Sequence, residues 1–439
     1  MKNYLRTILP ESIIIWTHKV RGMMAYYMYG RPSRHLKIIG ITGTNGKTTT
    51  CNMVARILEK ANYKVAMATT INFKIDEKEW VNKTKMTTVS PFALQKFLKE
   101  AVKAGCHWAI IETTSHAISQ YRNYGLEYNI AVLTNITHDH LDYHKTYEDY
   151  RDAKAELFKT GNTINIINAD DKSASYFKDL PAKRLITYGI EAEYKAQSTP
   201  QIGKPEIMGK KLILEATGSM FTVVTPSGQI AFELKLPGKF NVYNALAAIS
   251  CASALDLHLD VAKQALDSME GVPGRMERVD LGQSFTVLVD YAHTPDALEK
   301  IYQTLELSKH SRIISVLGSC GDRDRAKRPI LGALAGRYAD IAIITNEDPY
   351  TEDPVKIIEE VASGVPRGVH KNEPKVQGKN FFKELDRKKA IAMAIEMAHK
   401  DDIVIITGKG AEECMVWGTE KRPWSDRKIA KELLLKRMG

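Results

Sequence analysis

The stretch that decides the fold runs from residue 36 to residue 60, LKIIGITGTNGKTTTCNMVARILEK. Its first part, Leu36–Ile41, is an apolar run that predicts a buried strand, and Thr50–Lys60 carries apolar residues at helical spacing. Between them lies the glycine-rich turn Gly43–Thr49. A strand, such a turn and a helix in this order are typical of a phosphate-binding loop, because glycines let backbone N–H groups approach phosphate oxygens and the helix amino terminus attracts negative charge.

Each residue of this loop has an expected task. Lys47 would reach the β- and γ-phosphates of a nucleoside triphosphate, and the Thr48 hydroxyl would ligate Mg²⁺. Ile41 stands where the common G-x-x-x-x-G-K-[ST] pattern has its first glycine. A chance Gly-Lys-Thr turn is the alternative, but the flanking strand and helix favour nucleotide binding. The remaining residues expected around the phosphates are Gly43, Thr44, Asn45, Gly46 and Thr49.

Length and charge bound the possible classes of protein. A chain of 439 residues with 44% hydrophobic residues suggests about two or three domains with real cores. The formal net charge of +10 suits an anionic substrate, but the basic residues are scattered. No motif interleaves aromatic and basic residues, so the sequence predicts no nucleic-acid partner, and the charge is best explained by general solubility.

The cysteines and the apolar runs indicate the compartment. The five cysteines are widely spaced and form no C-x-x-C pair, which argues against a zinc site or a disulfide framework. A reducing cytosol is therefore expected. No uncharged apolar run approaches the ~20 residues that span a bilayer, and no signal-peptide cleavage pattern follows the first apolar stretch. These observations predict a cytoplasmic protein.

The chain divides into three predicted parts: residues 1–36, 37–273 and 274–439. The first is a short apolar and basic leader that we expect to be helical. It could lie as an amphipathic helix on a membrane surface, giving weak membrane contact, or pack its apolar side on the next domain. We favour packing, because apolar stripes usually belong to a core.

The other two parts alternate predicted strands with helical patterns, which predicts an α/β fold with a mostly parallel sheet in each. The segment from Arg184 to Leu236 is more β-like, and the turn Gly271–Gly274 separates the two series. Ligands of such sheets bind at the carboxyl ends of the strands. We therefore expect a central phosphate-loop ATPase domain, a Rossmann-like second domain and a cleft between them. The strand candidates are 109–111, 130–133, 164–167, 286–289, 313–317, 341–344 and 403–406.

Two predicted strands end in residues that suit a metal. Glu112 follows the strand at 109–111, and His140 lies in an acidic and histidine-rich segment after the strand at 130–133. Mg²⁺ prefers oxygen ligands, so Glu112 is a candidate beside Thr48. A histidine is a less usual ligand for Mg²⁺, and His140 taken alone would more often be a hydrogen-bonding loop residue.

Taken together, an ordered series of motifs resembles the Mur ligase family, and within it the MurE type, which adds the third residue to the peptidoglycan stem peptide. The resemblance covers almost everything from residue 37 to 439. The motifs that carry it are the phosphate loop, ETTSH at 112–116, NITHDHLDYH at 135–144, DAK at 152–154, PGKFNVYNALAA at 237–248, GR at 274–275, DYAHTPDA at 290–297, GDRDRAKRP at 321–329 and GKGAE at 408–412.

The resemblance implies an ATP-dependent ligase. ATP phosphorylates a substrate carboxylate, and the amine of an incoming amino acid attacks the acyl phosphate to form an amide. Lys47 and one Mg²⁺ on Thr48 and Glu112 would handle the β- and γ-phosphates. A second Mg²⁺ would lie on His140 and a carbamylated Lys154, because carbamylation turns an ammonium into an anionic oxygen ligand. Without the family, Lys154 would be taken for a solvated helix charge.

The resemblance also assigns binding residues. Asn244 would contact adenine, Asp290 the ribose, and Arg275 with His293 the phosphates, so that domain closure follows ATP binding. Arg323 would bind the carboxylate of the incoming amino acid, with Gly408 and Glu412 around its distal amine. The residues that would hold the muramyl-peptide acceptor are Thr87, Thr88, Thr114, Gln120 and Arg122.

Two departures from the family pattern bear on the substrates. The family carries an N-terminal uridine-binding domain of roughly a hundred residues, and only the leader stands in its place here. We therefore expect that the leader and central domain suffice, or that the acceptor differs and is lipid-linked.

The second departure is the loop Thr345–Tyr350. Ligases that add meso-diaminopimelate carry Asp-Asn-Pro-Arg, and Tyr350 occupies the arginine position without a cationic fork for a carboxylate. Glu347, Asp348 and Glu412 offer three carboxylates instead, which favours a diamino acid that ends in an ammonium, such as L-lysine or ornithine. Ala411 also replaces the family's usual histidine.

Other classes of protein remain as alternatives. A ligase of the same superfamily could act on a lipid-linked, pseudomurein-like or folate-like carboxylate, although the muramyl-peptide set speaks against folate. A degenerate nucleotide-binding partner would not need an intact Lys47, Thr48, Glu112, His140 and Lys154. A simple phosphate-loop kinase or GTPase lacks the motifs of the second domain. We expect ATP and Mg²⁺ as cofactors, small-molecule substrates and a monomer.

Overall fold

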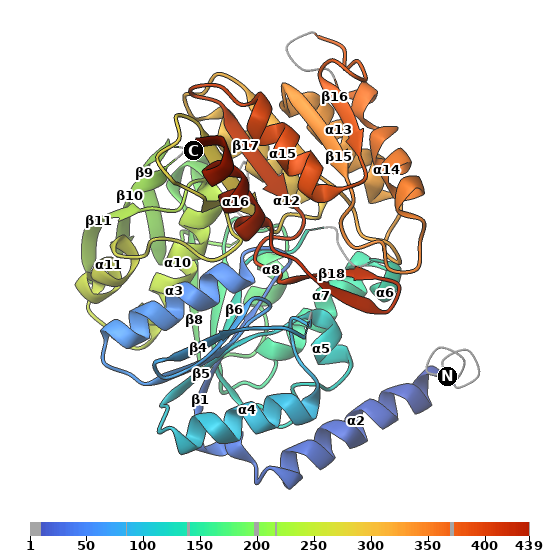
Figure 1. Cartoon of the computed structure of the whole chain (residues 1–439). Helices are drawn as coiled ribbons and strands as arrows, with labels where there is room; N and C mark the ends of the chain where they lie inside the picture. Colours follow the sequence, from blue (N-terminus) through green and yellow to red (C-terminus); the bar gives the residue numbers. More distant parts are fainter. Residues whose placement is uncertain are drawn as a thin grey trace. The chain divides into compact units, whose positions relative to one another are not determined.

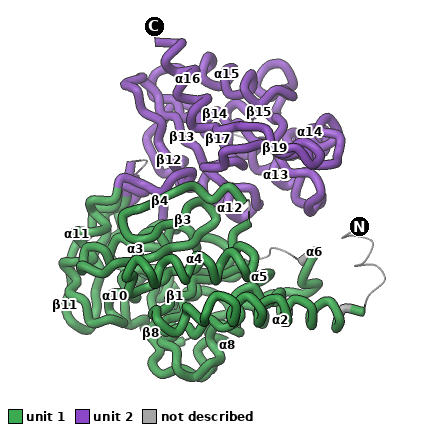
Figure 2. The backbone as a smooth tube through the Cα atoms, turned by 60° about the horizontal axis from the view of Figure 1, so that its bottom comes forward, with its two compact units in different colours: residues 1–213, 219–234, 240–269 green, residues 214–218, 235–239, 270–439 purple. Residues whose placement is uncertain are grey.

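The structure is a computed structural model that describes residues 10–84, 86–137, 141–196, 202–215, 217–368 and 373–438. The described residues divide into two compact units (Figure 2). Unit 1 draws on residues 1–213, 219–234 and 240–269, and unit 2 draws on residues 214–218, 235–239 and 270–439. His140, one of the predicted metal ligands, lies outside the described residues.

Unit 1 is built on one large sheet. Its strands are β1 (Lys37–Thr42), β2 (Val65–Ala68), β3 (Asn72–Ile75), β4 (Lys78–Val81), β5 (Trp108–Glu112), β6 (Tyr128–Leu133), β7 (Ile164–Asn168), β8 (Arg184–Ile190), β9 (Ile207–Glu215), β10 (Gly218–Thr225) and β11 (Gly228–Leu234). Among the described residues these form an 11-stranded sheet in the order β11-β10-β9-β8-β7-β6-β1-β5-β2-β3-β4.

The middle of this sheet is parallel and its two ends are antiparallel. β1 lies between β5 and β6 and runs parallel to both, with Ile39 opposite Ile110 on one side and Ile130 on the other. β2 pairs antiparallel with β3, and β10 pairs antiparallel with β11. The parallel strands are buried on both faces, which explains their continuous apolar sequences. Their carboxyl ends share one edge, so the loops after β1, β5 and β6 lie close together there.

Helices cover this sheet, and several begin at side-chain caps. Ser90, Thr114 and Thr146 each accept a hydrogen bond from a backbone N–H in the first turn of the helix that follows. The helices before residue 270 are α2 (Glu11–Met28), α3 (Lys47–Lys60), α4 (Pro91–Lys103), α5 (Ser115–Ser119), α6 (Leu141–His144), α7 (Tyr147–Ala155), α8 (Ala174–Lys178), α9 (Glu191–Ala196), α10 (Lys239–Ala254) and α11 (Leu259–Asp267), with short 3₁₀ turns at Pro32–His35 and Glu156–Phe158.

The leader forms α2, which lies alongside α4 (Figures 1 and 2). Ala25 and Tyr26 are buried, and the Tyr26 ring lies where a Cβ on Gly125 would come within 2.4 Å. The prediction that the leader packs on the next domain is confirmed for this half of the helix. The outer face keeps large apolar side chains exposed, among them Trp16 at 63% and Met28 at 63%.

Unit 2 is a second α/β layer structure. Its elements are the strands β12 (Glu277–Arg278), β13 (Thr286–Asp290), β14 (Ile313–Leu317), β15 (Ile341–Thr345), β16 (Phe381–Glu384), β17 (Ile403–Thr407), β18 (Cys414–Trp417) and β19 (Glu420–Pro423), and the helices α12 (Pro295–Glu306), α13 (Lys327–Tyr338), α14 (Pro354–Ala362), α15 (Arg387–Met397) and α16 (Asp426–Met438), with a 3₁₀ turn at Val365–Arg367.

The main sheet of unit 2 has the order β12-β13-β17-β14-β15-β16 and is parallel except at β12. Residues that alternate along these strands, such as Val287 and Val289, pack with Ile391 of α15 and Leu434 of α16 in one buried cluster. Strands β18 and β19 form a separate antiparallel hairpin. The loops after β13, β14, β15 and β17 therefore meet at one edge.

The predicted fold class is confirmed: a phosphate-loop domain with a largely parallel sheet is followed by a Rossmann-like α/β domain. Every strand candidate taken from the sequence overlaps an observed strand. The segment from Arg184 to Leu236 contributes β8 to β11, which extend the same sheet of unit 1. Among the described residues, no helix is both long enough and apolar enough to cross a bilayer.

Candidate active site

The phosphate loop joins β1 to α3 through two glycines, Gly43 and Gly46, whose positive φ and close neighbours disfavour any side chain. Gly43 has φ +149°, and a Cβ there would lie 1.9 Å from the Thr134 hydroxyl. Gly46 has φ +85°, and a Cβ there would lie 2.2 Å from Asn244 Oδ1. L-residues rarely adopt these backbone conformations, and the contacts leave no space for a side chain. The loop is therefore held tightly against the segment after β6 and against α10.

Hydrogen bonds to the loop after β6 fix the shape of the phosphate loop. Asn135 accepts from the Asn45 N–H at 3.0 Å and donates its own amide to the Asn45 carbonyl at 3.0 Å. The Thr134 hydroxyl also donates to Asn45 O at 2.7 Å, and the Thr44 N–H donates to Asn135 O at 2.8 Å. A loop held at so many points is preorganised to bind an anion.

Two lysines reach the same point of this loop. Lys47 Nζ donates to the carbonyl oxygens of Gly43 at 3.0 Å and Thr44 at 2.6 Å. Lys154 Nζ, on α7, donates to Gly43 O at 2.8 Å and lies 4.4 Å from the centre of the Tyr150 ring. Lys154 is only 1% exposed. The structure thus brings both predicted lysines to the phosphate loop, and it rules out a solvated helix charge for Lys154.

Glu112 lies at the centre of a group of oxygen atoms. Its Oε2 accepts from the Thr48 hydroxyl at 2.9 Å and from the Thr70 N–H at 2.8 Å, and its Oε1 accepts from the Thr70 hydroxyl at 2.9 Å. Glu112 is 2% exposed. A buried carboxylate with adjacent hydroxyls is a set of hard oxygen donors, so these residues fit Mg²⁺.

Thr70 was not predicted as a site residue. It follows the buried strand β2, and a hydroxyl at the carboxyl end of an apolar run was the signal that could have revealed it. Outside the residues that the structure leaves undescribed, no three His, Cys, Asp or Glu side chains gather as a metal site. Because His140 is among the undescribed residues, its part in a metal site stays a prediction.

The predicted acceptor residues form one hydrogen-bonded chain that starts at Glu112. The Thr88 hydroxyl donates to Glu112 O at 3.0 Å and accepts from the Thr114 N–H at 3.4 Å. Arg122 donates to Thr88 O at 2.8 Å and to Gln120 Oε1 at 2.6 and 3.1 Å. Four of the five predicted residues are therefore brought together.

Three further residues, Thr87, Tyr143 and Asn244, belong to this edge of unit 1. Thr87 lies next to the chain and is partly exposed. Tyr143, which the sequence argument missed, accepts from Gln120 Nε2 at 3.3 Å, and its ring lies 4.1 Å from that of His116. Asn244 is buried behind Gly46 and donates to Asn241 at 3.1 Å. Asn244 therefore supports the phosphate loop. Its contact with adenine stays a prediction.

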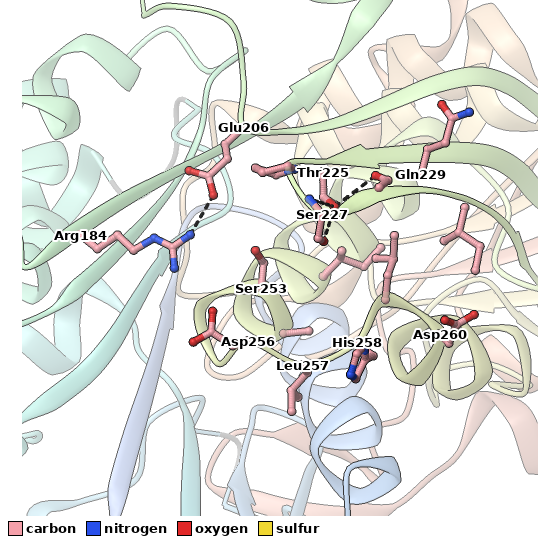
Figure 3. Close-up of a pocket in the computed structure, with 16 residues that line it drawn as sticks. Arg184, Glu206, Thr225, Ser227, Gln229, Ser253, Asp256, Leu257, His258 and Asp260 are labelled. Carbon is pink, nitrogen blue, oxygen red and sulfur yellow. Dashed lines mark hydrogen bonds and ion pairs between the residues drawn. The ribbon is translucent and has the colours of Figure 1, made fainter.

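A separate cavity of about 440 Å³ lies in unit 1 (Figure 3). The ion pair between Arg184 and Glu206, at 3.0 Å, stands on one side of it, and Ser253, Asp256 and His258 stand opposite. None of the predicted site residues lines this cavity. We therefore assign it no part in the chemistry.

In unit 2 the residues predicted to bind the nucleotide are Asp290 at the end of β13, His293 in the loop that follows and Arg275 just before β12. Both oxygens of Asp290 accept backbone N–H bonds, from Met276 at 2.7 Å and from Ala292 at 2.6 Å. Burial nevertheless raises the pKa of Asp290 above its ordinary value. Arg275 stacks over the Tyr291 ring at 4.7 Å, and the His293 ring nitrogen Nδ1 lies 2.9 Å from Tyr291 O. The three predicted residues thus lie close together around the end of β13.

The residues predicted to bind the amino acid lie in the loops after β14, β15 and β17. Glu347 is 2% exposed, and a Cβ on Gly408, which has φ +106°, would lie 2.4 Å from Glu347 Oε2. Burial raises the pKa of Glu347 above its ordinary value. Arg323 and Tyr350 also meet here, with the guanidinium 5.3 Å from the centre of the ring.

Lys409 changes the predicted charge of this pocket. Its ammonium is fully buried and donates to both oxygens of Asp348 at 2.9 Å and also to Glu412. Burial by itself would lower the pKa of Lys409, but attraction to Glu412 and Asp348 outweighs burial and raises it. The expectation of three carboxylates for a substrate ammonium therefore needs correction, because two of them already share a cation that the sequence argument overlooked.

Comparison with known proteins agrees with this arrangement. Residues 41–252 match the Mur ligase middle domain, and residues 274–410 match the Mur ligase, glutamate ligase domain. A UDP-N-acetylmuramoyl-L-alanyl-D-glutamate–2,6-diaminopimelate ligase of Bacillus cereus is 38% identical over 98% of this chain and 84% of the relative. A UDP-N-acetylmuramyl-tripeptide synthetase of Roseiflexus sp. is 39% identical over 94% of this chain and 81% of the relative.

A solved structure gives the same result. It is a UDP-N-acetylmuramoyl-L-alanyl-D-glutamate–2,6-diaminopimelate ligase with 31% identity and a TM-score of 0.64, covering 96% of this chain and 84% of its own. Identity of this degree over nearly the whole chain, with the phosphate loop, Glu112 and Lys154 at one edge of the sheet, decides the family. The chain belongs to the Mur ligase family, as an ATP-dependent, ADP-forming ligase of the MurE type.

Proposed function

We propose that the protein adds a diamino acid to a muramoyl dipeptide in peptidoglycan precursor synthesis, using ATP and Mg²⁺. The observation that carries this proposal is the hydrogen-bonded chain from Thr48 through Glu112 to Thr88 and Arg122. It joins the phosphate loop to the residues assigned to the acceptor within one rigid edge of unit 1. Such a link would hold an acceptor carboxylate near the γ-phosphate, which is the positioning that phosphoryl transfer requires.

The reaction has two steps. An acceptor carboxylate oxygen attacks the γ-phosphorus, and the bond to ADP breaks to give an acyl phosphate. The amine of the incoming amino acid then attacks the acyl carbon, phosphate leaves and the nitrogen loses a proton. Lys47 and the N–H groups of the phosphate loop stabilise the negative charge that is transferred. Arg323 would bind the carboxylate of the amino acid.

Thr48 and Glu112 would hold one Mg²⁺, and His140 with a carbamylated Lys154 would hold a second. When bound, Mg²⁺ neutralises charge on the phosphates and orients them. The burial of Lys154 at 1% exposure supports the carbamate, because a buried ammonium beside Lys47 is costly and a carbamate replaces it with an anion.

For the amino acid we propose lysine or ornithine, although the Bacillus cereus relative is named for diaminopimelate. Tyr350 offers no cationic fork, and the guanidinium of Arg323 lies over the Tyr350 ring, 5.3 Å from its centre. Glu347 remains for a substrate ammonium, since Lys409 binds Asp348 and Glu412.

The exposed outer face of α2 supports weak contact with a membrane surface. Trp16 and Met24 are exposed there at 63% and 51%, on a helix that also carries Lys19 and Arg21. Such a surface would favour a lipid-linked acceptor as the alternative substrate. Sedimentation with vesicles of anionic and of neutral lipid tests this. Binding to anionic vesicles that Trp16→Ser weakens supports the contact, and no binding to either removes it.

We propose that the enzyme is cytoplasmic and monomeric. The experiment that tests its function incubates the purified enzyme with ATP, Mg²⁺ and UDP-N-acetylmuramoyl-dipeptide and measures the release of phosphate. Amino acids are added one at a time. Release with lysine or ornithine and not with diaminopimelate supports the whole proposal, and faster release with diaminopimelate overturns the choice of amino acid. Release with none would exclude the UDP-linked acceptor, and a lipid-linked acceptor would be the next substrate.

A further inference from the structure

Glu347 is a buried carboxylate with one unused oxygen. Its Oε1 accepts a hydrogen bond from Cys320 Sγ at 2.9 Å. Its Oε2 has no hydrogen-bond partner among the described residues, although the side chain is 98% buried. An unpaired buried oxygen of this kind costs free energy in a folded protein. Its simplest explanation is that it binds a group that is not part of the chain.

The loop that carries Cys320 is fixed at several points. Arg328, itself fully buried, donates to Cys320 O at 3.0 Å and to both oxygens of Glu352 at 2.9 and 3.0 Å. The Gly321 N–H donates to Asp348 O at 2.8 Å, and a Cβ on Gly321 would lie 1.9 Å from Pro349 O. The thiol of Cys320 is therefore held against Glu347 by the backbone on either side.

The buried cations near Glu347 are engaged elsewhere. Lys409 binds Asp348 and Glu412, and Arg387 forms a buried ion pair with Asp426 at 2.7 Å. Both lower the pKa of Glu347, but burial outweighs them. Glu347 Oε2 faces Gly408, where a Cβ would lie 2.4 Å away, so only a residue without a side chain leaves room beside this oxygen.

We propose that Cys320 positions Glu347 so that its free Oε2 accepts the side-chain ammonium of the incoming diamino acid. Cys320 is then a specificity-determining residue that acts through Glu347. The inference rests on the proposed function and names the group that selects a terminal ammonium. A thiol that holds Oε1 leaves Oε2, which faces Gly408, without a partner, and the charge-assisted bond to an ammonium would supply one.

The test compares three variants with lysine and with norleucine, which has the same carbon chain but no ammonium. Cys320→Ala removes the donor, and Cys320→Ser keeps one. We expect Cys320→Ala to raise the KM for lysine about tenfold, with kcat and the KM for ATP unchanged. We expect Cys320→Ser to stay near wild type. With norleucine, wild type and Cys320→Ala should have the same KM.

Cys414→Ala is the matched control, because Cys414 is the other partly exposed cysteine of unit 2. It should leave the KM for lysine unchanged. Thermal unfolding of each variant shows that the fold is intact. A KM for lysine in Cys320→Ala within twofold of wild type overturns the inference, and so does an equal loss with norleucine, which would indicate a merely structural thiol. Wild-type enzyme that uses no amino acid at all would instead contradict the proposed function.

Discussion

Lys47 and Lys154 share one acceptor, the carbonyl oxygen of Gly43, at 3.0 and 2.8 Å. Two ammonium groups that converge on one oxygen repel each other, and burial strengthens the repulsion. An anion at this point would relieve it. The phosphates of ATP supply one such anion, and a carbamate on Lys154 would supply another.

Lys154→Ala should abolish ligase activity, because the side chain that would become the anionic ligand is gone. Lys154→Arg should not restore activity, since a guanidinium cannot form the carbamate. Added short carboxylic acids should restore part of the activity of Lys154→Ala by occupying the vacated space. Phosphate release measures all three, and full activity of Lys154→Ala would contradict the carbamate.

Gly46→Ala should prevent ATP binding. The new Cβ would lie 2.2 Å from Asn244 Oδ1, and the residue would keep φ +85°. Gly105→Ala is the control, because Gly105 has φ +74° but no atom within 4 Å of the added Cβ. It bears the backbone strain, about 1–2 kcal/mol, without the collision. Nucleotide binding by calorimetry separates the two, and normal binding by Gly46→Ala would show that the loop can move aside.

Glu347→Gln should stabilise the fold and weaken lysine binding. Burial raises the pKa of Glu347 above its ordinary value of 4.5. The side chain therefore contributes its full stability below pH 4.5, and this contribution is lost as the pH rises through the raised pKa. Glutamine is neutral throughout and avoids this loss, which we expect to be on the order of 1–3 kcal/mol at neutral pH. Urea unfolding measures it, and a less stable Glu347→Gln would contradict the argument.

The contribution of Glu352 to stability should depend on pH in the opposite sense to that of Glu347. Hydrogen bonds from Arg328 lower the pKa of Glu352 from 4.5 to about 2. The contribution is therefore present above pH 4.5 and is lost as pH falls toward 2. The difference in unfolding free energy between wild type and Glu352→Gln should shrink over this window. Glu420→Gln, which alters an exposed ion pair with Arg422, serves as control and should change the unfolding free energy by about 1 kcal/mol or less.

Arg387→Met should destabilise unit 2 strongly. Arg387 and Asp426 are both fully buried, and Arg387 also donates to Thr407 O at 2.7 Å. Removal of the cation leaves a buried carboxylate unpaired, at a cost of roughly 3–5 kcal/mol. Arg422→Met breaks an exposed pair with Glu420 and should cost about 1 kcal/mol or less. Urea unfolding of both variants decides, and equal losses would contradict the role of burial.

Several features of the site could be predicted from the sequence because they are local. The phosphate loop needs glycines at fixed offsets and lies between a strand and a helix, so Gly43 to Thr49 carry their own geometry. Glu112 follows directly on β5, and its place at the sheet edge follows from the parallel order of the strands. Each of these depends on neighbours in the chain and on the regular geometry of strands and helices.

The pairing partners could not be predicted in this way. Lys409 meets Asp348 across 61 residues of sequence, and Thr44 meets Tyr150 across 106. In the sequence, Cys320 is only one of five widely spaced cysteines. The pairing of β14 with β15 places it beside Glu347. Such pairs depend on which strands become neighbours and on how deeply each group is buried.

The sequence by itself determined the α/β class, the phosphate loop and the family motifs, because glycine conformation and apolar periodicity act over a few residues. Only the tertiary structure decided which charged side chains pair with each other inside the protein and which remain to bind a substrate. A carboxylate is free or paired according to the cations that the fold buries beside it, and Lys409 left Glu347 with the one unpartnered carboxylate oxygen among the buried described residues.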